Sequence, residues 1–220
     1  ADGVAVFLSD INEELLKNVI TGLRENGVDA DGGVYDASSV TEAGRFIADA
    51  KTRLNRLDIF VNNAGGIRAQ PFPEVTEQTW DWSMDLNLKG AYFHMQEAAK
   101  VMAEQQSGTI INIASVAGIA GGMTFSPPYA ASKAALINLT KVAAANLASR
   151  GVTVNAVAPG IVNTAFNWNL DEEIGVGQQN RKPGDFLAER VAPIPLGRIS
   201  EPEDVAGVVA FLAGPDGSYI

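Results

Sequence analysis

Short apolar runs alternate with longer amphipathic stretches along almost the whole chain. The apolar runs are rich in Val and Ile and are typical of buried strands, which we expect at 4–8, 33–35, 58–62, 109–114 and 152–157. The stretches between them carry apolar residues at helical spacing. They predict helices at 12–26, 39–54 and 129–148, two helices within 76–105 that bend near 85–87, and a last helix opening at 201–204.

Strands that alternate with helices predict an α/β fold with a parallel sheet. No repeat or linker interrupts the pattern, so residues 1–220 are expected to form one domain. Residues 164–195, which contain several glycines, Trp168 and Pro183, do not fit the alternation. We expect an irregular excursion there that serves as a substrate-binding loop.

Composition narrows the classes of function. The 220 residues are 46% hydrophobic with 22 glycines, as in globular α/β proteins, and the net charge of −10 argues against nucleic acid or an anionic membrane as partner. The absence of cysteine excludes disulfides and thiolate chemistry, and His94 is the one histidine, so we expect no metal site and a packing role for His94. With no apolar run of membrane-spanning length and no signal peptide, a cytoplasmic location is expected.

Polar residues gather where the expected strands end. Asp10, Asp36, the N-N-A-G run at 62–65, Ser115 and the Pro-Gly pair at 159–160 each follow a strand. In an open parallel sheet, ligands bind outside the carboxyl ends of the strands. This shared position indicates a ligand site at that edge.

Tyr129 and Lys133 are the candidate catalytic residues at this edge of the expected sheet. Four residues separate them, so they share one face of the expected helix. A neighbouring ammonium favours the phenolate, which would lower the pKa of Tyr129 and let it exchange a proton near neutral pH. Ser115 carries a hydroxyl that could share the substrate oxygen. Taken alone, this spacing is far more often that of a solvated Tyr and Lys on a helix surface.

The wider set of motifs identifies a family. The chain resembles the short-chain dehydrogenases/reductases over essentially all of its length. That resemblance implies a doubly wound, Rossmann-like α/β/α fold that lacks the first and last strands of the family in this chain. The matching pieces are D-I-N (10–12), Asp36, N-N-A-G (62–65), N-L-K-G (87–90), I-N-I-A-S (111–115), Y-A-A-S-K (129–133), V-N-A-V-A-P-G (154–160), I-V-N-T (161–164) and E-P-E-D-V-A (201–206).

The resemblance implies four catalytic roles. Tyr129 is the general acid/base, and Lys133 lowers its pKa while holding the nicotinamide ribose. Ser115 holds the substrate oxygen, and Asn87 positions a water in a proton relay behind the lysine. Two structural alternatives stay open: Asn87 could satisfy backbone groups at the helix bend, and Ser115 could be a turn residue. The interval from Ser115 to Tyr129 is one residue longer than is common in the family, and a loop at 124–128 could absorb it.

Asp10 bears on the choice of cofactor. A carboxylate at this strand end accepts hydrogen bonds from a ribose 2′-OH and repels a 2′-phosphate, and no Arg or Lys lies within 9–14, so NAD is favoured over NADP. Asn62 is expected to be structural, tying neighbouring strands together. The other cofactor contacts that the resemblance implies are Asp36 at the adenine, Asn63, Ala64 and Gly65 at the adenosine ribose, Tyr129 and Lys133, and Pro159, Gly160, Ile161 and Thr164 near the nicotinamide.

One departure from the family is large. Its first strand, the glycine-rich turn that binds the pyrophosphate and the following helix have no counterpart in the chain, and the sequence stops at 217–220 where relatives continue into a final strand. The sequence is therefore expected to be a fragment of a longer protein. We expect an open gap between strands 4–8 and 58–62, and expect the fragment alone to be unstable, to bind NAD poorly and to be inactive.

The favoured function is NAD-dependent interconversion of a secondary alcohol and a ketone. Runs at 182–185 and 195–198 faintly resemble the acetoin/butanediol and polyol dehydrogenases and favour a small polar diol, polyol or hydroxyketone. A 3-oxoacyl-[acyl-carrier-protein] reductase is the alternative enzyme; a dinucleotide-binding sensor or scaffold, and a purely structural module, are the non-catalytic alternatives. The helices at 88–105 and 129–148 are expected to build a homotetramer. Expected substrate contacts are Ser115, Met123, Phe125, Phe166, Trp168 and Leu170.

Overall fold

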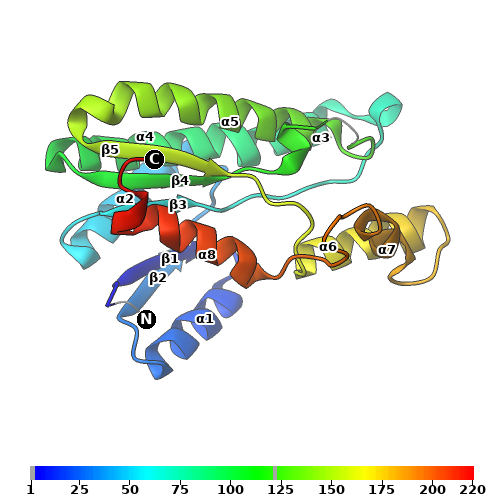
Figure 1. Ribbon diagram of the computed structural model, residues 1–220, viewed down its shortest axis with the longest axis horizontal. Coiled ribbons are helices and arrows are strands. Elements are labelled where there is room, and N and C mark those ends of the chain that lie inside the picture. Colours follow the sequence, from blue (N-terminus) through cyan, green and yellow to red (C-terminus); the bar gives the residue numbers. More distant parts are fainter. Residues whose placement is uncertain (1–2, 121–122) are drawn as a thin grey trace.

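Parallel strands lie between two layers of helices in the computed structural model, which describes residues 3–120 and 123–220 (Figure 1). The strands are β1 (Val6–Asp10), β2 (Ala30–Val34), β3 (Ile59–Asn62), β4 (Gly108–Ile113) and β5 (Val152–Val157). The helices are α1 (Glu13–Glu25), α2 (Val40–Leu54), α3 (Glu77–Met84), α4 (Ala91–Gln105), α5 (Pro127–Leu147), α6 (Ala165–Leu170), α7 (Asp185–Val191) and α8 (Pro202–Ala213). The α/β fold class is confirmed. Within the described ranges, no helix combines the length and apolarity needed to cross a bilayer.

Capping residues start three of the helices where the sequence predicts them. The Asn12 side chain accepts the Leu15 N–H before α1, and Ser39 accepts the Glu42 N–H before α2. Thr76 begins α3 in the same way. Each cap satisfies a backbone donor that the first turn leaves free. A π-helical segment, Asp85–Gly90, joins α3 to α4 where the bend is expected, and the bend itself stays a prediction.

The larger part of the core lies between the sheet and helices α2, α4 and α5, with Phe46, Phe60, Met102 and Ile110 at its centre. Met102 and Ile110 are fully buried, and cutting either back to alanine is expected to cost about 2–5 kcal/mol. On the opposite face, α1 packs against β1 and β2 in a smaller cluster formed by Leu16, Ile20, Ala30, Val6 and Leu8.

Buried amides tie the sheet to this helical layer. Asn62 Nδ2 on β3 donates to the Ala91 carbonyl at 2.7 Å and to Asn112 Oδ1 on β4 at 3.1 Å. Asn112 Nδ2 in turn donates to Thr140 Oγ1 on α5 at 3.0 Å. The structural role predicted for Asn62 is confirmed. His94 is also buried, with Nδ1 2.9 Å from the Gly90 carbonyl, which agrees with the packing role predicted for it.

The strands form two separate parallel sheets. β1 pairs with β2, with Val6 opposite Ala30, while β3, β4 and β5 form a second sheet in that order. β1 and β3 share no ladder, so the predicted lack of direct pairing between them is confirmed. That an absent strand explains the gap stays a prediction.

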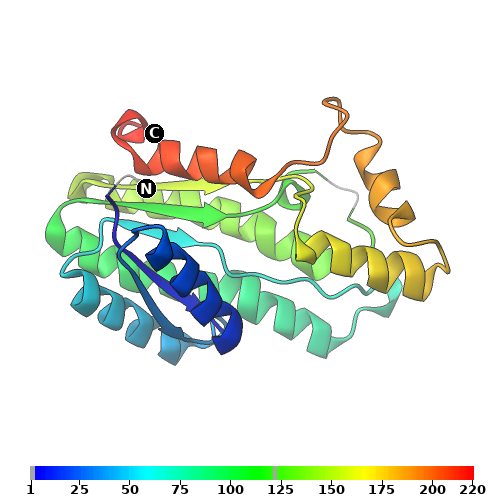
Figure 2. The same ribbon diagram turned by 90° about the horizontal axis from the view of Figure 1, so that it is seen from below.

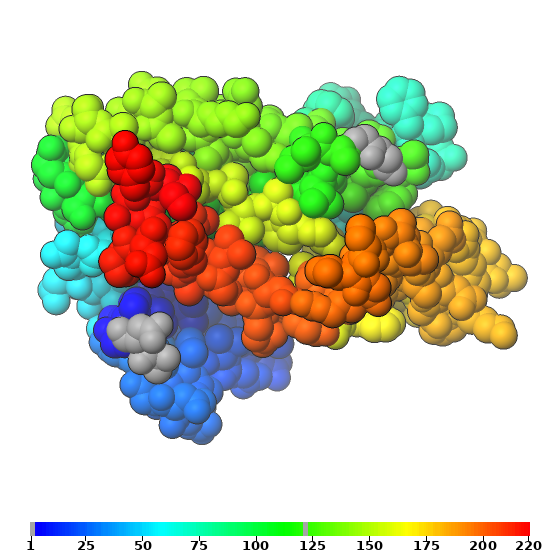
Figure 3. Space-filling view, in the orientation of Figure 1, coloured from blue at the N-terminus to red at the C-terminus, as the bar shows by residue number. Residues whose placement is uncertain are grey.

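Two expectations about elements are wrong. β2 begins at Ala30 rather than at residue 33, because its Asp-Gly-Gly sequence pairs with β1 despite a low strand propensity. Residues 164–195 are mainly helical: α6 continues into a π-helical segment, Asp171–Gln178, and α7 follows. This part of the chain lies at one end of the molecule, where Figure 2 and Figure 3 show it in yellow and orange.

Tertiary packing explains the helices of 164–195. Leu170, Ile174 and Phe186 come together in a small buried cluster, which supplies an apolar face to α6 and α7. The buried Asp171 carboxylate accepts the Gly184 N–H at 2.6 Å and the Leu187 N–H at 2.7 Å, and so satisfies donors in the first turn of α7. The glycines and Pro183 therefore flank or interrupt helices instead of marking an irregular loop.

Candidate active site

Tyr129 and Lys133 lie one turn apart on α5 and are both buried, with exposed fractions of 8% and 4%. The Lys133 ammonium is 5.8 Å from the centroid of the Tyr129 ring, so the predicted shared face is confirmed. Lys133 Nζ donates to the Ile113 carbonyl at 2.8 Å, at the carboxyl end of β4. This bond fixes the lysine at the edge where ligands bind in such sheets.

Ser115 follows β4 and begins a short 3₁₀ turn, with its Oγ accepting the Ala117 N–H at 3.1 Å. Gly118 brings this turn against α5, because a Cβ at Gly118 would lie 2.6 Å from the Ala134 nitrogen. The Ser115 hydroxyl thereby reaches the Tyr129 phenol closely enough to lower its pKa. The structure thus brings Ser115, Tyr129 and Lys133 together.

The pKa values of Tyr129 and Lys133 differ from the expectation that Lys133 lowers the pKa of Tyr129. Burial raises the pKa of Tyr129, and Ser115 and Arg190 lower it only in part. Lys133 is not among the groups that lower the pKa of Tyr129; burial lowers the pKa of Lys133 itself to about 8. The predicted depression of the Tyr129 pKa by Lys133 is therefore wrong in this structure. Tyr129 therefore carries its proton at neutral pH.

Asn87 lies in the π-helical segment between α3 and α4, with an exposed fraction of 1%. Its amide accepts the Gly66 N–H at 3.0 Å and donates to the Gly66 carbonyl at 2.9 Å and to the Ser83 carbonyl at 3.1 Å. A Cβ on Gly65 would lie 2.9 Å from Asn87 Oδ1 and 3.3 Å from Lys133 Nζ, so all three residues meet. The Asn87 side chain satisfies backbone groups, as the structural alternative expects; the water relay stays a prediction.

Exposed polar groups lie at the strand ends expected to meet adenosine. Asp10 Oδ1 accepts the Asn12 N–H at 2.8 Å, and Asp36 Oδ1 accepts the backbone and side-chain donors of Ser38 at 2.8 and 2.7 Å. Both carboxylates are on the surface and keep a second oxygen for a ligand. Asn63 and Ala64 are exposed directly after β3.

A cavity of about 500 Å³ lies on the side expected to meet the nicotinamide. It brings Gly160 and Ile161, two predicted cofactor residues, next to Val116, the neighbour of Ser115. Pro159 accepts the Val116 N–H at 3.0 Å, while Thr164 precedes α6 and is not part of the lining. The remaining lining residues are Arg190, Ile194, Leu196, Arg198, Ser200 and Asp204.

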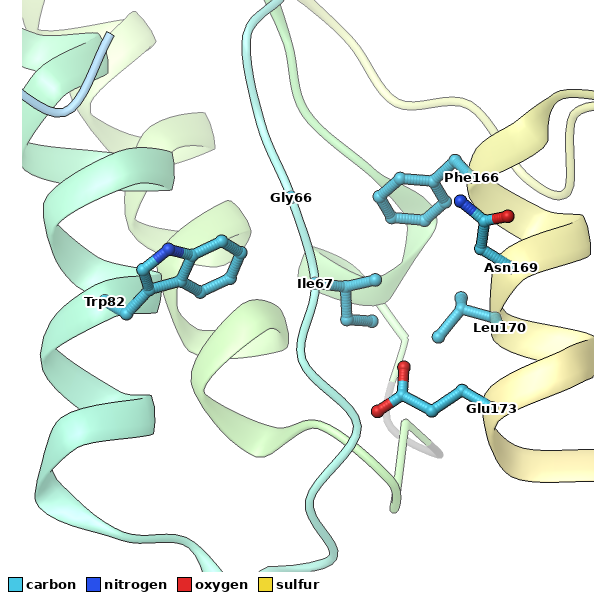
Figure 4. A pocket seen from close by; sticks show the side chains of 7 residues that line it. All are labelled: Gly66, Ile67, Trp82, Phe166, Asn169, Leu170 and Glu173. Carbon is cyan, nitrogen blue, oxygen red and sulfur yellow. The ribbon is translucent and has the colours of Figure 1, made fainter. Parts of the chain in front are cut away.

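A second, smaller cavity of about 170 Å³ lies between α3 and the helix that runs from α6 into 171–178. Figure 4 shows the Trp82 side chain on one side and those of Phe166, Leu170 and Glu173 on the other, with the Gly66–Ile67 loop segment between them. Asn169 completes the lining. The ring centroids of Phe166 and Tyr129 are 6.2 Å apart, so Phe166 joins this cavity to the candidate proton donor.

The other predicted substrate contacts differ in their positions. The Phe125 ring packs edge-on against Phe186, with centroids 5.8 Å apart, close to the Phe166 wall. Met123 is half-buried and lines neither cavity. Trp168 is half-exposed and donates to Asn163 Oδ1 at 2.9 Å, so α6 does not bring it to either cavity.

Arg190 is a site residue that sequence reasoning missed. Its guanidinium carbon lies 5.5 Å from the Phe125 ring and 5.4 Å from the Phe186 ring, and its charge lowers the pKa of Tyr129. The signal in the sequence is the spacing of four between Phe186 and Arg190, which places both on one helical face. Because residues 164–195 are expected to be irregular from the sequence, this helical spacing does not single out Arg190 there.

Comparison with known proteins agrees with this arrangement. The family described as short chain dehydrogenase matches residues 1–175. A diacetyl reductase ((S)-acetoin forming) of Staphylococcus epidermidis is 36% identical over 220 residues, which cover 100% of this chain and 85% of the relative. A 3-oxoacyl-acyl-carrier-protein reductase of Staphylococcus aureus is 36% identical over 209 residues, which cover 95% of this chain and 80% of the relative.

Solved structures show the same fold. NAD⁺-bound xylitol dehydrogenase superposes with a TM-score of 0.90 at 30% identity, covering 98% of this chain and 85% of that one. An actinorhodin polyketide ketoreductase with NADPH superposes with a TM-score of 0.93 at 33% identity, covering 100% of this chain and 84% of that one. The chain therefore belongs to the short-chain dehydrogenase family and is an oxidoreductase of the class that interconverts CH–OH and ketone groups.

Proposed function

We propose that this protein uses NAD to interconvert a ketone and a secondary alcohol on a small polar substrate, with Tyr129 as the general acid/base. The observation that carries the proposal is the meeting of Ser115, Tyr129 and Lys133 at the carboxyl end of β4. A protonated tyrosine in a buried position is suited to donate a proton to an oxygen that gains negative charge.

In the proposed reduction, the nicotinamide supplies the hydride when it is bound. The Ser115 hydroxyl donates a hydrogen bond to the carbonyl oxygen of the substrate, which orients the carbonyl toward Tyr129. Tyr129 then gives its proton to that oxygen, and its raised pKa keeps the proton on the phenol until negative charge develops there. Lys133, anchored on the Ile113 carbonyl, is placed to hold the nicotinamide ribose.

The residues present suit a nicotinamide dinucleotide at both of its ends. Gly160 and Ile161 line the large cavity next to the Ser115 turn, which suits the nicotinamide. Asp10 presents an exposed carboxylate at the end of β1, which suits a ribose 2′-OH and opposes a 2′-phosphate. Relatives include both an NAD⁺ complex and an NADPH complex, and Asp10 is our reason for preferring NAD.

Two substrate classes follow from the relatives. The diacetyl reductase supports a small diketone, hydroxyketone or diol. The 3-oxoacyl-acyl-carrier-protein reductase, which is also 36% identical to this chain, supports a 3-oxoacyl thioester as the second candidate. The preference of Asp10 for NAD favours the first class.

A turnover screen tests the proposal. The purified full-length protein is offered NADH or NADPH with diacetyl, acetoin, a ketose and an acetoacetyl thioester, and the reverse reactions with butanediol and polyols. Among these substrates, we expect the fastest turnover with NADH and a small diketone or hydroxyketone. Tyr129→Phe should lower kcat by about 10²–10⁴-fold, whereas Tyr219→Phe, at an exposed position, should not change it. Binding of NAD without turnover of any substrate would instead indicate a dinucleotide sensor or scaffold.

A further inference from the structure

Arg190 lies in the last turn of α7 and is held from several sides. Its Nη1 donates to Asn167 Oδ1 at 3.1 Å, and its guanidinium lies over the rings of Phe125 and Phe186. Aromatic faces stabilise a cation and fix the plane of the guanidinium. The side chain is therefore positioned before any ligand arrives.

The charge of Arg190 has no carboxylate partner within the described part of the chain. Neighbouring arginines do have partners: Arg181 pairs with Glu189, and Arg198 pairs with both oxygens of Asp204 at 2.6 and 3.0 Å. Burial lowers the pKa of Arg190, which means that the guanidinium has lost hydration without gaining an ion pair.

Asp171 is the acidic residue whose charge acts on Arg190, but its oxygens are engaged elsewhere. They accept the Gly184 and Leu187 N–H groups at the start of α7, so Asp171 stabilises the helix rather than pairing with the arginine. An anion placed against Arg190 would therefore gain a charge-assisted hydrogen bond that the protein itself does not provide.

Arg190 brings its positive charge, unpaired within the described residues, close to the candidate catalytic residues. It lines the large cavity together with Gly160 and Ile161, and its charge acts on the Tyr129 phenol. A small molecule whose carbonyl meets Tyr129 can thus extend a second group toward Arg190. A carboxylate fits best, because the guanidinium presents two parallel N–H groups that match its two oxygens.

We propose that Arg190 binds a carboxylate of the substrate, and that the substrate class of this site is a short oxo or hydroxy carboxylic acid. This inference rests on the proposed function. In the oxidation, the carbinol carbon loses a hydride to the nicotinamide and its hydroxyl group gives its proton to the Tyr129 phenolate, so that the alcohol becomes a ketone; reduction reverses both transfers. The carboxylate does not react; it fixes the orientation of the substrate.

Matched substrates that differ in one charge provide the test. Pyruvate is compared with diacetyl, and acetoacetate with pentane-2,4-dione, because in each pair a methyl ketone replaces the carboxylate at nearly constant size. With wild-type protein and NADH, we expect kcat/KM to be about 10- to 100-fold higher for the acid of at least one pair. Arg190→Gln should lower kcat/KM for the acid by about 10-fold more than for the diketone, because only the acid loses a charge-assisted bond and any effect through Tyr129 is common to both substrates. Arg190→Lys should restore part of the advantage.

Arg181→Gln is the control, because Arg181 belongs to the same segment and is paired with Glu189. Equal rates for acid and diketone in the wild type, or equal losses for both in Arg190→Gln, would overturn the carboxylate assignment and leave the proposed function intact. If no substrate is reduced, the proposed function fails, and ligand-observed NMR with acetoacetate and pentane-2,4-dione then decides the assignment. Binding of the acid that is lost in Arg190→Gln supports it, and absence of such binding overturns it.

Discussion

At the scale of single residues, the buried ammonium of Lys133 gives the stability of the fold a distinct pH dependence. Its pKa falls from 10.5 to about 8 because burial removes hydration from the charged form. Between pH 8 and pH 10.5 the unfolded chain binds more protons at this position than the folded chain, so stability rises with pH across that window. Below pH 8 the charge opposes folding by roughly 3 kcal/mol.

Lys133→Met should remove this dependence. We expect the free energy of unfolding of the variant, relative to wild type, to fall by roughly 3 kcal/mol as the pH rises from 8 to 10.5. Urea unfolding at several pH values measures it, and Lys141→Met, at an exposed position of the same helix, should follow the wild-type pH dependence. Parallel curves for Lys133→Met and wild type would show that Lys133 does not titrate in this window.

Asp10 makes a second prediction at this scale. Removing its carboxylate takes away both an acceptor for the ribose 2′-OH and a repulsion of the 2′-phosphate. Asp10→Ala should therefore lower the ratio of kcat/KM with NADH to that with NADPH by about 10-fold or more, and Glu25→Ala, an exposed carboxylate on α1, should leave the ratio unchanged. A wild-type protein that already prefers NADPH would show the interpretation of Asp10 to be wrong.

At the scale of elements, the sequence predicts those helices and strands whose ends are set by interactions between nearby residues. Capping by Asn12 and Ser39 fixes where α1 and α2 begin, and the apolar run of β5 gives that strand its observed bounds. The helices within 164–195 could not be predicted in this way. They depend on Asp171, which caps α7 from thirteen or more residues upstream, and on contacts between distant apolar residues. Arg190 was missed for the same reason.

The element that carries Tyr129 also bears on assembly. Along α5, Leu136 is buried and Leu139 and Ala143 pack on the core, whereas Val142 is 51% exposed. We expect Val142 to lie in the contact of a homotetramer. Val142→Glu should lower the mass measured by light scattering after size exclusion, because a charge would be buried at the contact. Val19→Glu on α1, where Val19 is 54% exposed, should keep the wild-type mass. A monomeric wild type would contradict the expected contact.

At the scale of the whole molecule, the site joins elements that are far apart in the sequence. Ser115 comes from the turn after β4, Tyr129 and Lys133 from α5, Gly65 from the loop after β3 and Arg190 from α7. The motifs predict the first four because each follows a strand or lies on one helical face. No local pattern predicts how Arg190 approaches them, since its position depends on how the 164–195 segment packs at the end of the molecule.

The division into two sheets leads to a prediction about which backbone amides of β1 and β3 are unpaired. β1 bonds to β2 along one edge, with the Val6 N–H donating to the Asp29 carbonyl at 2.8 Å. Because the amides of a strand alternate between its two edges, those of Phe7 and Ser9 point to the edge that faces away from β2. By the same alternation, the Thr109 N–H bond to the Asp58 carbonyl directs the Val61 amide away from β4.

Hydrogen exchange measured by NMR should resolve this alternation. We expect the amides of Phe7, Ser9 and Val61 to exchange at least about a hundredfold faster than those of Val6 and Leu8, because no ladder bond must open first. Ile111, in the middle strand of the second sheet, is the internal reference for full protection. Equal protection of Phe7 and Val6 would mean that the free edge of β1 is paired in solution, and β1 and β3 would then not be the edges of two separate sheets.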